Sequence, residues 1–241
     1  MAGGGLSLRH VAVFVGAFLA FGLLTRVCSS GTPVYENSAE VPGELTRFDS
    51  LGALPAVTTF AGPGAQLVQM RTLFVREDGT QDLEASYVSN APVTIYAFVR
   101  PNQQQVDSSA PVGARGSVAP FEEVEVEIAR PHVVTVKSGN DAARAMQHNG
   151  MRLDSQGPTT DNTTVAAPVC SFAQLWADAK ARGAPAGAVV AITYAAVDEH
   201  ELDDEIDGSP PTGPFPVHYD FAIDEIQMHL RFDAACKSEV R

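Results

Sequence analysis

The sequence predicts a mainly β protein: a β-sandwich with one or two short helices, preceded by a single N-terminal transmembrane helix. From Gln66 onward, apolar and polar residues alternate in short segments separated by Gly, Pro, Asn and Asp, as in strands with one buried face. Before them, an apolar stretch near the N-terminus suggests a membrane anchor. We expect an anchor at residues 1–28, an extended, partly packed linker at 29–64, and an acidic β-sandwich domain at 65–241.

The segment Leu6–Val27 is predicted to span a membrane. It has 22 residues, or about 33 Å of helix, and Arg9 and Arg26 can extend their charges to the two interfaces. Small residues recur at intervals of four, which would let another membrane helix approach closely; they are Ala12, Gly16 and Ala20. We therefore expect integral membrane protein subunits as partners, a cytoplasmic N-terminus and a periplasmic or otherwise extracytoplasmic C-terminal domain.

A cleaved signal peptide is the alternative for the same segment. The strictly apolar run Val11–Leu24 has 14 residues, which suits a signal-peptide core better than a spanning helix of about 17–25 residues. The domain is exported on either interpretation. Export permits a disulfide between Cys170 and Cys236, although two separate thiols remain the alternative because the sequence does not give their separation.

The domain is expected to contain about eight strands and one clear helix. The helix is Phe172–Arg182, because Ser171 and Gln174 form a capping box before it and Gly183 follows it. Two further helical turns are expected at Asp141–His148. The predicted strands are Leu67–Val75, Leu83–Val88, Val93–Val99, Val124–Ile128, His132–Lys137, Ala188–Val197, His218–Ile223 and Ile226–Phe232.

Charge is the clearest surface property of the domain. Of the 16 basic residues, Arg9 and Arg26 precede it, whereas all 29 acidic residues follow Arg26. Such a surface repels nucleic acid and attracts basic proteins. The strand beginning at Val124 has one apolar and one acidic face; the latter carries Glu123, Glu125 and Glu127. A solvated, charge-protected strand is one interpretation, and a docking face for a basic soluble protein is the other.

One acidic loop is a candidate cation site. Asp198–Gly208 offers several carboxylates, and hard cations such as Ca²⁺ need several oxygen ligands. The spacing of Asp203, Glu205 and Asp207 imitates the first half of a calcium loop. Pro214 stands where such a loop has its bidentate Glu, so a solvated acidic loop is the competing interpretation, and we expect no other cofactor.

Two stretches resemble known families. Tyr87–Val99, YVSNAPVTIYAFV, resembles the hairpins of exported immunoglobulin-like β-sandwich domains, and this likeness implies no functional residue. Phe172–Tyr194, FAQLWADAKARGAPAGAVVAITY, with the later HYDFAIDEI, is similar to one half of GyrI-like effector-binding modules. That likeness implies small-ligand binding by Trp176 and Glu225. Such modules carry two halves, and no matching helix is predicted before Pro168. Core packing of Trp176 is the alternative.

The sequence predicts no enzyme. It lacks the nucleophile elbow, the P-loop, the Rossmann glycine fingerprint, and the His-Glu-x-x-His and Cys-x-x-Cys motifs. We therefore expect a non-catalytic accessory or scaffold subunit of a larger membrane complex, such as an electron-transfer or other bioenergetic complex. The alternative is a secreted or periplasmic domain, released after signal cleavage, that binds a small ligand or hydrolyses a substrate.

Overall fold

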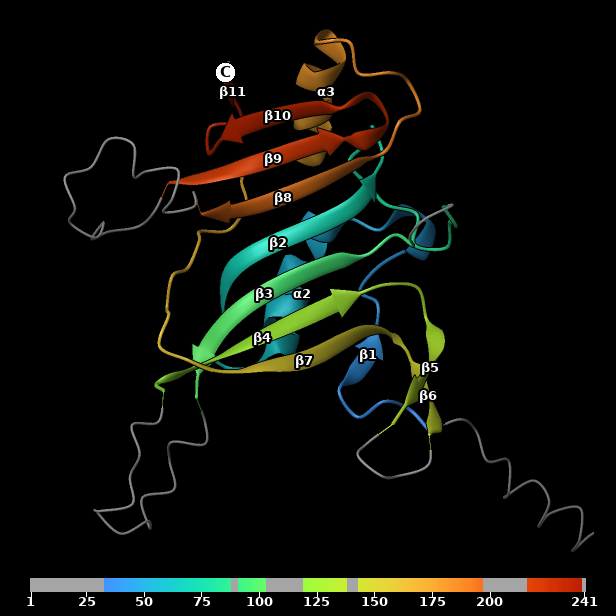
Figure 1. Cartoon of the computed structure of the whole chain (residues 1–241), viewed down its shortest axis with the longest axis vertical. Coiled ribbons are helices and arrows are strands. Elements are labelled where there is room, and N and C mark those ends of the chain that lie inside the picture. The colour runs from blue at the N-terminus through green and yellow to red at the C-terminus, as the bar shows by residue number, and fades with distance from the viewer. Residues whose placement is uncertain (1–32, 88–90, 103–118, 138–142, 197–215, 240–241) are drawn as a thin grey trace, which may run out of the picture.

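The computed structural model describes residues 33–87, 91–102, 119–137, 143–196 and 216–239 of the chain. They form a nine-stranded antiparallel sheet, a two-stranded sheet, two α-helices and two short 3-10 helices (Figure 1). In chain order the elements are β1 (Ser38–Glu40), η1 (Leu45–Arg47), α2 (Ser50–Ala61), β2 (Gln66–Val75), β3 (Thr94–Pro101), β4 (Phe121–Ile128), β5 (His132–Val136), β6 (Arg144–His148), β7 (Gly150–Thr159), α3 (Phe172–Ala181), β8 (Val190–Ala196), β9 (Val217–Ile223), η3 (Asp224–Ile226), β10 (Met228–Asp233) and β11 (Ser238–Glu239).

The mainly β class is confirmed, but the architecture differs from the expected immunoglobulin-like β-sandwich. The described strands form one open sheet in the order β1-β7-β4-β3-β2-β8-β9-β10-β11. Both helices lie on the same side of this sheet (Figure 1). They bury the apolar faces of the strands, which is the task of the second sheet in a sandwich.

The sheet consists of two equivalent units that meet at its centre. In the first, α2 leads into β2, β3 and β4, and in the second, α3 leads into β8, β9 and β10. Each triplet of strands is an antiparallel meander, and the antiparallel pairing of β2 with β8 joins the two triplets. A helix therefore precedes each triplet of strands, whereas the sequence predicted only the helix α3.

Both helices begin at side-chain caps. The predicted capping box of α3 is present, because Ser171 Oγ accepts from the Gln174 N–H and the Gln174 side chain accepts from the Ser171 N–H. Such a cap is worth about 1 kcal/mol. At α2, Asp49 accepts from the N–H groups of Leu51 and Gly52. Pro55 lies inside α2, and this proline concealed the helix from the sequence-based prediction.

The core lies between the helices and the sheet. Trp176 of α3 is fully buried and packs edge-on against Phe221 of β9, with ring centroids 5.2 Å apart. At α2, the Tyr96 hydroxyl donates a 2.6 Å hydrogen bond to the Ser50 carbonyl. The aromatic residues of this core are Phe48, Tyr96, Phe98, Phe172, Trp176, Tyr194, Tyr219, Phe221 and Phe232.

Four segments differ from their predictions. The expected linker contains β1, η1 and α2, so its described part belongs to the folded domain. Arg144–His148 is strand β6 and not helical, because its backbone pairs with β5. No strand was predicted between Met151 and Pro168, whereas β7 extends to Thr159 and is held between β1 and β4. Within Leu83–Tyr87, the described part of one expected strand, there is no strand.

The predicted anchor, residues 1–28, lies outside the described residues. Across the part of the chain that is described, neither helix combines the length and apolar composition needed to cross a membrane.

His148 is a buried titratable group at the junction of the two sheets. Its Nδ1 accepts from the Gly150 N–H at 3.0 Å, while no described group bonds to its buried Nε2. The ring stacks on His132 with centroids 4.8 Å apart. Burial, reinforced by the nearby His132 and Arg152, lowers the pKa of His148 to about 4.

The position of His148 predicts a loss of stability in mild acid. The imidazole of the unfolded chain binds a proton near pH 6.5, whereas that of the folded chain binds one only near pH 4. The free energy of unfolding therefore decreases as the pH is lowered from 6.5 to 4. The free energy of unfolding, measured with urea, should differ between pH 7 and pH 4.5, and we expect His148→Gln to reduce this difference by about 2 kcal/mol. His229→Gln, at an exposed histidine, is the control. If the free energy of unfolding depended on pH equally in wild type and in His148→Gln, His148 would not be the group responsible.

Candidate functional site

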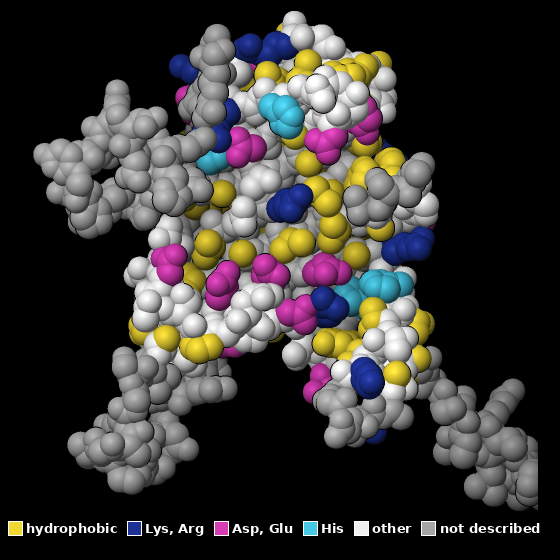
Figure 2. Space-filling view, viewed as in Figure 1, with side chains coloured by type: hydrophobic (Ala, Val, Ile, Leu, Met, Phe, Trp, Pro, Cys, Tyr) yellow, Lys and Arg dark blue, Asp and Glu magenta, His cyan; other side chains and the backbone are white. Residues whose placement is uncertain are grey.

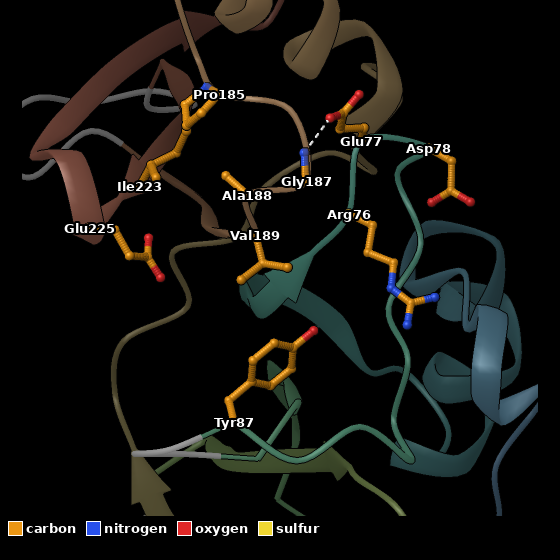
Figure 3. Close-up of a pocket in the computed structure, with 10 residues that line it drawn as sticks. All are labelled: Arg76, Glu77, Asp78, Tyr87, Pro185, Gly187, Ala188, Val189, Ile223 and Glu225. Atoms are coloured by element: carbon orange, nitrogen blue, oxygen red, sulfur yellow. Dashed lines mark hydrogen bonds between the residues drawn. The ribbon is translucent and has the colours of Figure 1, made fainter.

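A two-chambered groove lies at the end of the β2–β8 seam. The larger chamber has a volume of about 710 Å³ and the smaller about 140 Å³, and they share Val189 and Glu225. Figure 3 shows Glu225 and Tyr87 on two sides of Val189 in the larger chamber. The larger chamber is lined by Arg76, Glu77, Asp78, Tyr87, Pro185, Gly187, Ala188, Val189, Ile223 and Glu225. The smaller is lined by Arg71, Leu73, Phe74, Val189, Val190, Ala191, Ala222, Asp224 and Glu225.

A bulge in β2 shapes the groove. The register between β2 and β8 shifts between Thr72 and Val75, and Phe74 within this interval has a φ of 62°. This left-handed conformation costs a residue other than glycine roughly 1–2 kcal/mol. The Phe74 ring stacks on Tyr87, with centroids 4.2 Å apart and planes 9° apart. The bulge thus places an aromatic pair where the two chambers meet.

Buried polar groups hold the bulge in place. The side-chain amide of Gln81, which is fully buried, donates to the carbonyl oxygens of Leu73 and Val93. Thr94 Oγ1 in turn donates to Gln81 Oε1 at 2.6 Å. Because breaking such a buried network costs free energy, it holds the Leu73 carbonyl, directly before Phe74, in place.

Most charges at the rim of the larger chamber are paired. Arg76 pairs with Asp82, Lys180 with Glu77, and Arg47 with Asp78. The hydrogen bond from Lys180 and that from the Gly187 N–H lower the pKa of Glu77.

Glu225 differs from these rim charges, because no described residue forms a hydrogen bond or ion pair with its carboxylate. Arg71, in the smaller chamber, likewise has no described partner. The wall that the chambers share therefore combines the aliphatic side chain of Val189 with the unpaired carboxylate of Glu225.

The lining of the two chambers is aromatic, aliphatic, acidic and basic. Neither chamber is lined by a described His, Cys, Ser or Lys side chain, which are common nucleophiles and general bases. Nor do three His, Cys, Asp or Glu side chains of the described ranges come together as metal ligands.

The predicted acidic face lies on the opposite side of the sheet from the helices. Glu125 of β4 is paired in register with Asp154 of β7, and Glu127 with Arg152. Arg152 bridges Glu127 and Asp154 at 3.4 and 2.6 Å, while Gln156 donates to Glu125 at 2.9 Å. Figure 2 shows a row of acidic side chains across this face.

Carboxylate crowding in this row affects the titration of Glu125. Partial burial raises the pKa of the Glu125 carboxyl, and the negative charges of Glu123 and Asp154 raise it further. Glu123, Glu125 and Glu127 therefore form one electrostatically coupled group, in agreement with the alternation seen in the sequence.

The other predicted site residues lie in different parts of the structure or outside the described residues. Cys170 and Cys236 are joined by a disulfide, with Cα atoms 5.6 Å apart. Trp176 is fully buried, so it packs in the core and cannot contact a ligand, whereas Glu225 lines the groove. The predicted helix-packing residues Ala12, Gly16 and Ala20, and the calcium candidates Asp203, Glu205 and Asp207, lie outside the described residues.

The sequence did not reveal the Phe74–Tyr87 pair. A left-handed φ is expected at Gly or Asn and not at Phe, so no residue type marked the bulge. Comparison with known family models, curated proteins and solved structures gives no match for this chain. The site therefore has to be interpreted from its own geometry.

Removal of one carboxylate from the acidic row is predicted to lower the pKa of a neighbouring carboxyl group. In Glu123→Gln the largest repulsive charge on Glu125 is lost, so the pKa of Glu125 should fall toward the ordinary value of a glutamate. Carbon-detected NMR titration of the side-chain carboxyl carbons measures this change. Glu84→Gln, at an exposed site outside the row, should leave the Glu125 titration unchanged. An unaltered Glu125 titration in Glu123→Gln would refute the coupling.

Proposed function

We propose that this chain is a non-catalytic binding protein whose two-chambered groove holds a small amphipathic cation. The observation that carries the proposal is that the unpaired Glu225 carboxylate lines both chambers, one together with Tyr87 and the other together with its stacking partner Phe74. Aromatic faces attract cations and apolar rings, and a carboxylate in a largely apolar groove favours a positive charge. The ring of such a ligand packs against Tyr87 and Val189, and its cationic group approaches Glu225.

The arrangement of the fold supports this proposal independently. The effector-binding modules that the sequence resembles carry two halves, and this domain contains two units of one helix and three strands. The groove lies at one end of the seam between these units, and ligand sites are common at such junctions.

A ligand and its uncharged isostere test the proposal. Benzyltrimethylammonium should shift the NMR signals of Tyr87 and Val189, whereas its carbon analogue neopentylbenzene should bind at least tenfold more weakly. Glu225→Gln should weaken binding of the cation about tenfold, or about 1.4 kcal/mol, and Tyr87→Ala should weaken both ligands. Glu36→Gln, at an exposed acid far from the groove in the sequence, is the matched control. Equal binding of the two probes would exclude the proposed charge recognition.

The accessory-subunit function remains a second candidate, and the acidic row favours it. We propose in this case that the Leu6–Val27 segment anchors the chain to integral membrane subunits and that the exported domain docks a basic soluble protein. Within the described residues, both α-helices lie on the other side of the sheet from Glu123, Glu125 and Glu127 (Figure 1). Complementary charge steers association and gives it a strong dependence on salt.

A charge-matched pair of triple variants tests the docking face. Replacement of Glu123, Glu125 and Glu127 by Gln should reduce retention of the native domain on immobilised cytochrome c at low salt. Replacement of Glu36, Glu44 and Glu84 by Gln removes the same net charge from exposed sites elsewhere and should have a smaller effect. If both triple variants lost retention equally, the net charge of the domain and not a particular face would determine binding to cytochrome c. Purification of the native chain from its source in mild detergent tests the accessory role, which requires co-purifying membrane subunits.

A further inference from the structure

The outer edge of β5 presents unpaired backbone groups. Among the described strands, β5 pairs only with β6. The Gln147 N–H donates to the Pro33 carbonyl at 2.8 Å, and the Gln147 carbonyl accepts from the Tyr35 N–H at 2.9 Å. Both groups of Gln147 thus point away from β5. Because Val133 is the residue opposite Gln147, alternation in an antiparallel ladder directs the N–H and C=O groups of Val133 and Thr135 outward.

The side chains at this edge are apolar and exposed. Val133 is 56 % exposed, and Val34, which bridges to Gln147 on the other side, is 51 % exposed. Residues paired across strands share a face, so Val133, the half-buried Gln147 and Val34 form one row, in which both valines are exposed. The strand contains no Pro, Asp, Glu or Lys between His132 and Val136, although natural edges are usually protected by such residues.

The charge around β5 is opposite to that of the chain as a whole. Arg130, Lys137 and Arg144 flank the two strands, all are exposed, and no described residue forms an ion pair with them. The described segments 130–137 and 143–149 contain no acidic residue, and Asp141, in the connection between them, lies outside the described residues; the whole chain has a net charge of −13. Figure 1 shows β5 and β6 at one corner of the molecule, beyond the end of β4.

We propose that β5 is a docking edge for an extended segment of a partner protein in which acidic and apolar residues alternate. The partner segment adds as a strand, so that its backbone satisfies Val133 and Thr135. Its apolar side chains cover Val133, and its carboxylates approach Arg130 and Lys137. A second copy of β5 is a poor occupant, because it would bring two sets of these cations together.

Amide exchange of the full chain measures the proposed pairing. In the free protein the amides of Val133 and Thr135 should exchange rapidly with deuterium, whereas that of Val134, which faces β6, should exchange slowly. A synthetic peptide of alternating Glu and Val should slow exchange at Val133 and Thr135 at least tenfold at saturation and leave Val134 unchanged. A peptide of alternating Lys and Val should not.

Three outcomes would overturn the proposal. The first is unchanged exchange with the Glu-Val peptide, and the second is equal slowing by the Lys-Val peptide. The third is slowing that depends on protein concentration without peptide, which would identify a second copy as the occupant. As a further check, Lys137→Ala should weaken peptide binding at least threefold, whereas Lys237→Ala, at an exposed lysine elsewhere, should not.

Discussion

The antiparallel pairing of β2 with β8 is the contact on which the domain depends. It joins two helix-and-meander units into one sheet, so that their apolar faces form a continuous core beneath both helices. Met70 lies opposite Tyr194, and Thr72 opposite Ile192, and all four are buried. Without this pairing each unit would expose a long strand edge, which favours aggregation. The same seam ends in the bulge that forms the groove, so folding and the candidate site share one interaction.

Different interactions determine the environment of the two faces of the sheet. On the helix side, burial of apolar surface contributes about 25 cal/mol per Å², and the partly buried Arg100 pairs with Glu122 at 3.0 Å beside the α2 carboxyl end. On the other side, charged rows on β4 and β7 keep the sheet hydrated. Like charges repel a second sheet of the same kind, which agrees with an open sheet and with the absence of a sandwich in the described residues.

The sequence predicted those elements whose signal is local. The capping box fixed α3, and alternation located β2, β3, β4, β8, β9 and β10. It did not reveal α2, because Pro55 and two threonines lower the helix propensity of a segment that packing stabilises. Nor did it reveal β7, whose later residues are polar, since its pairing comes from distant β1 and β4. Alternation shows that one face of a strand is buried, but not whether a helix or a sheet covers it.

The groove illustrates why the site was harder to predict than the strands. Next to the left-handed Phe74, the Leu73 carbonyl accepts a hydrogen bond from Gln81, which accepts one in turn from Thr94 of the neighbouring strand β3. The strain of roughly 1–2 kcal/mol is offset by this network and by the stack on Tyr87, which contributes about 0.5–1.5 kcal/mol. An ordinary β conformation at Phe74 would continue the alternation of β2 and direct the ring differently. The retained strain, together with the buried network beside it, is the reason that we treat this corner as the candidate site.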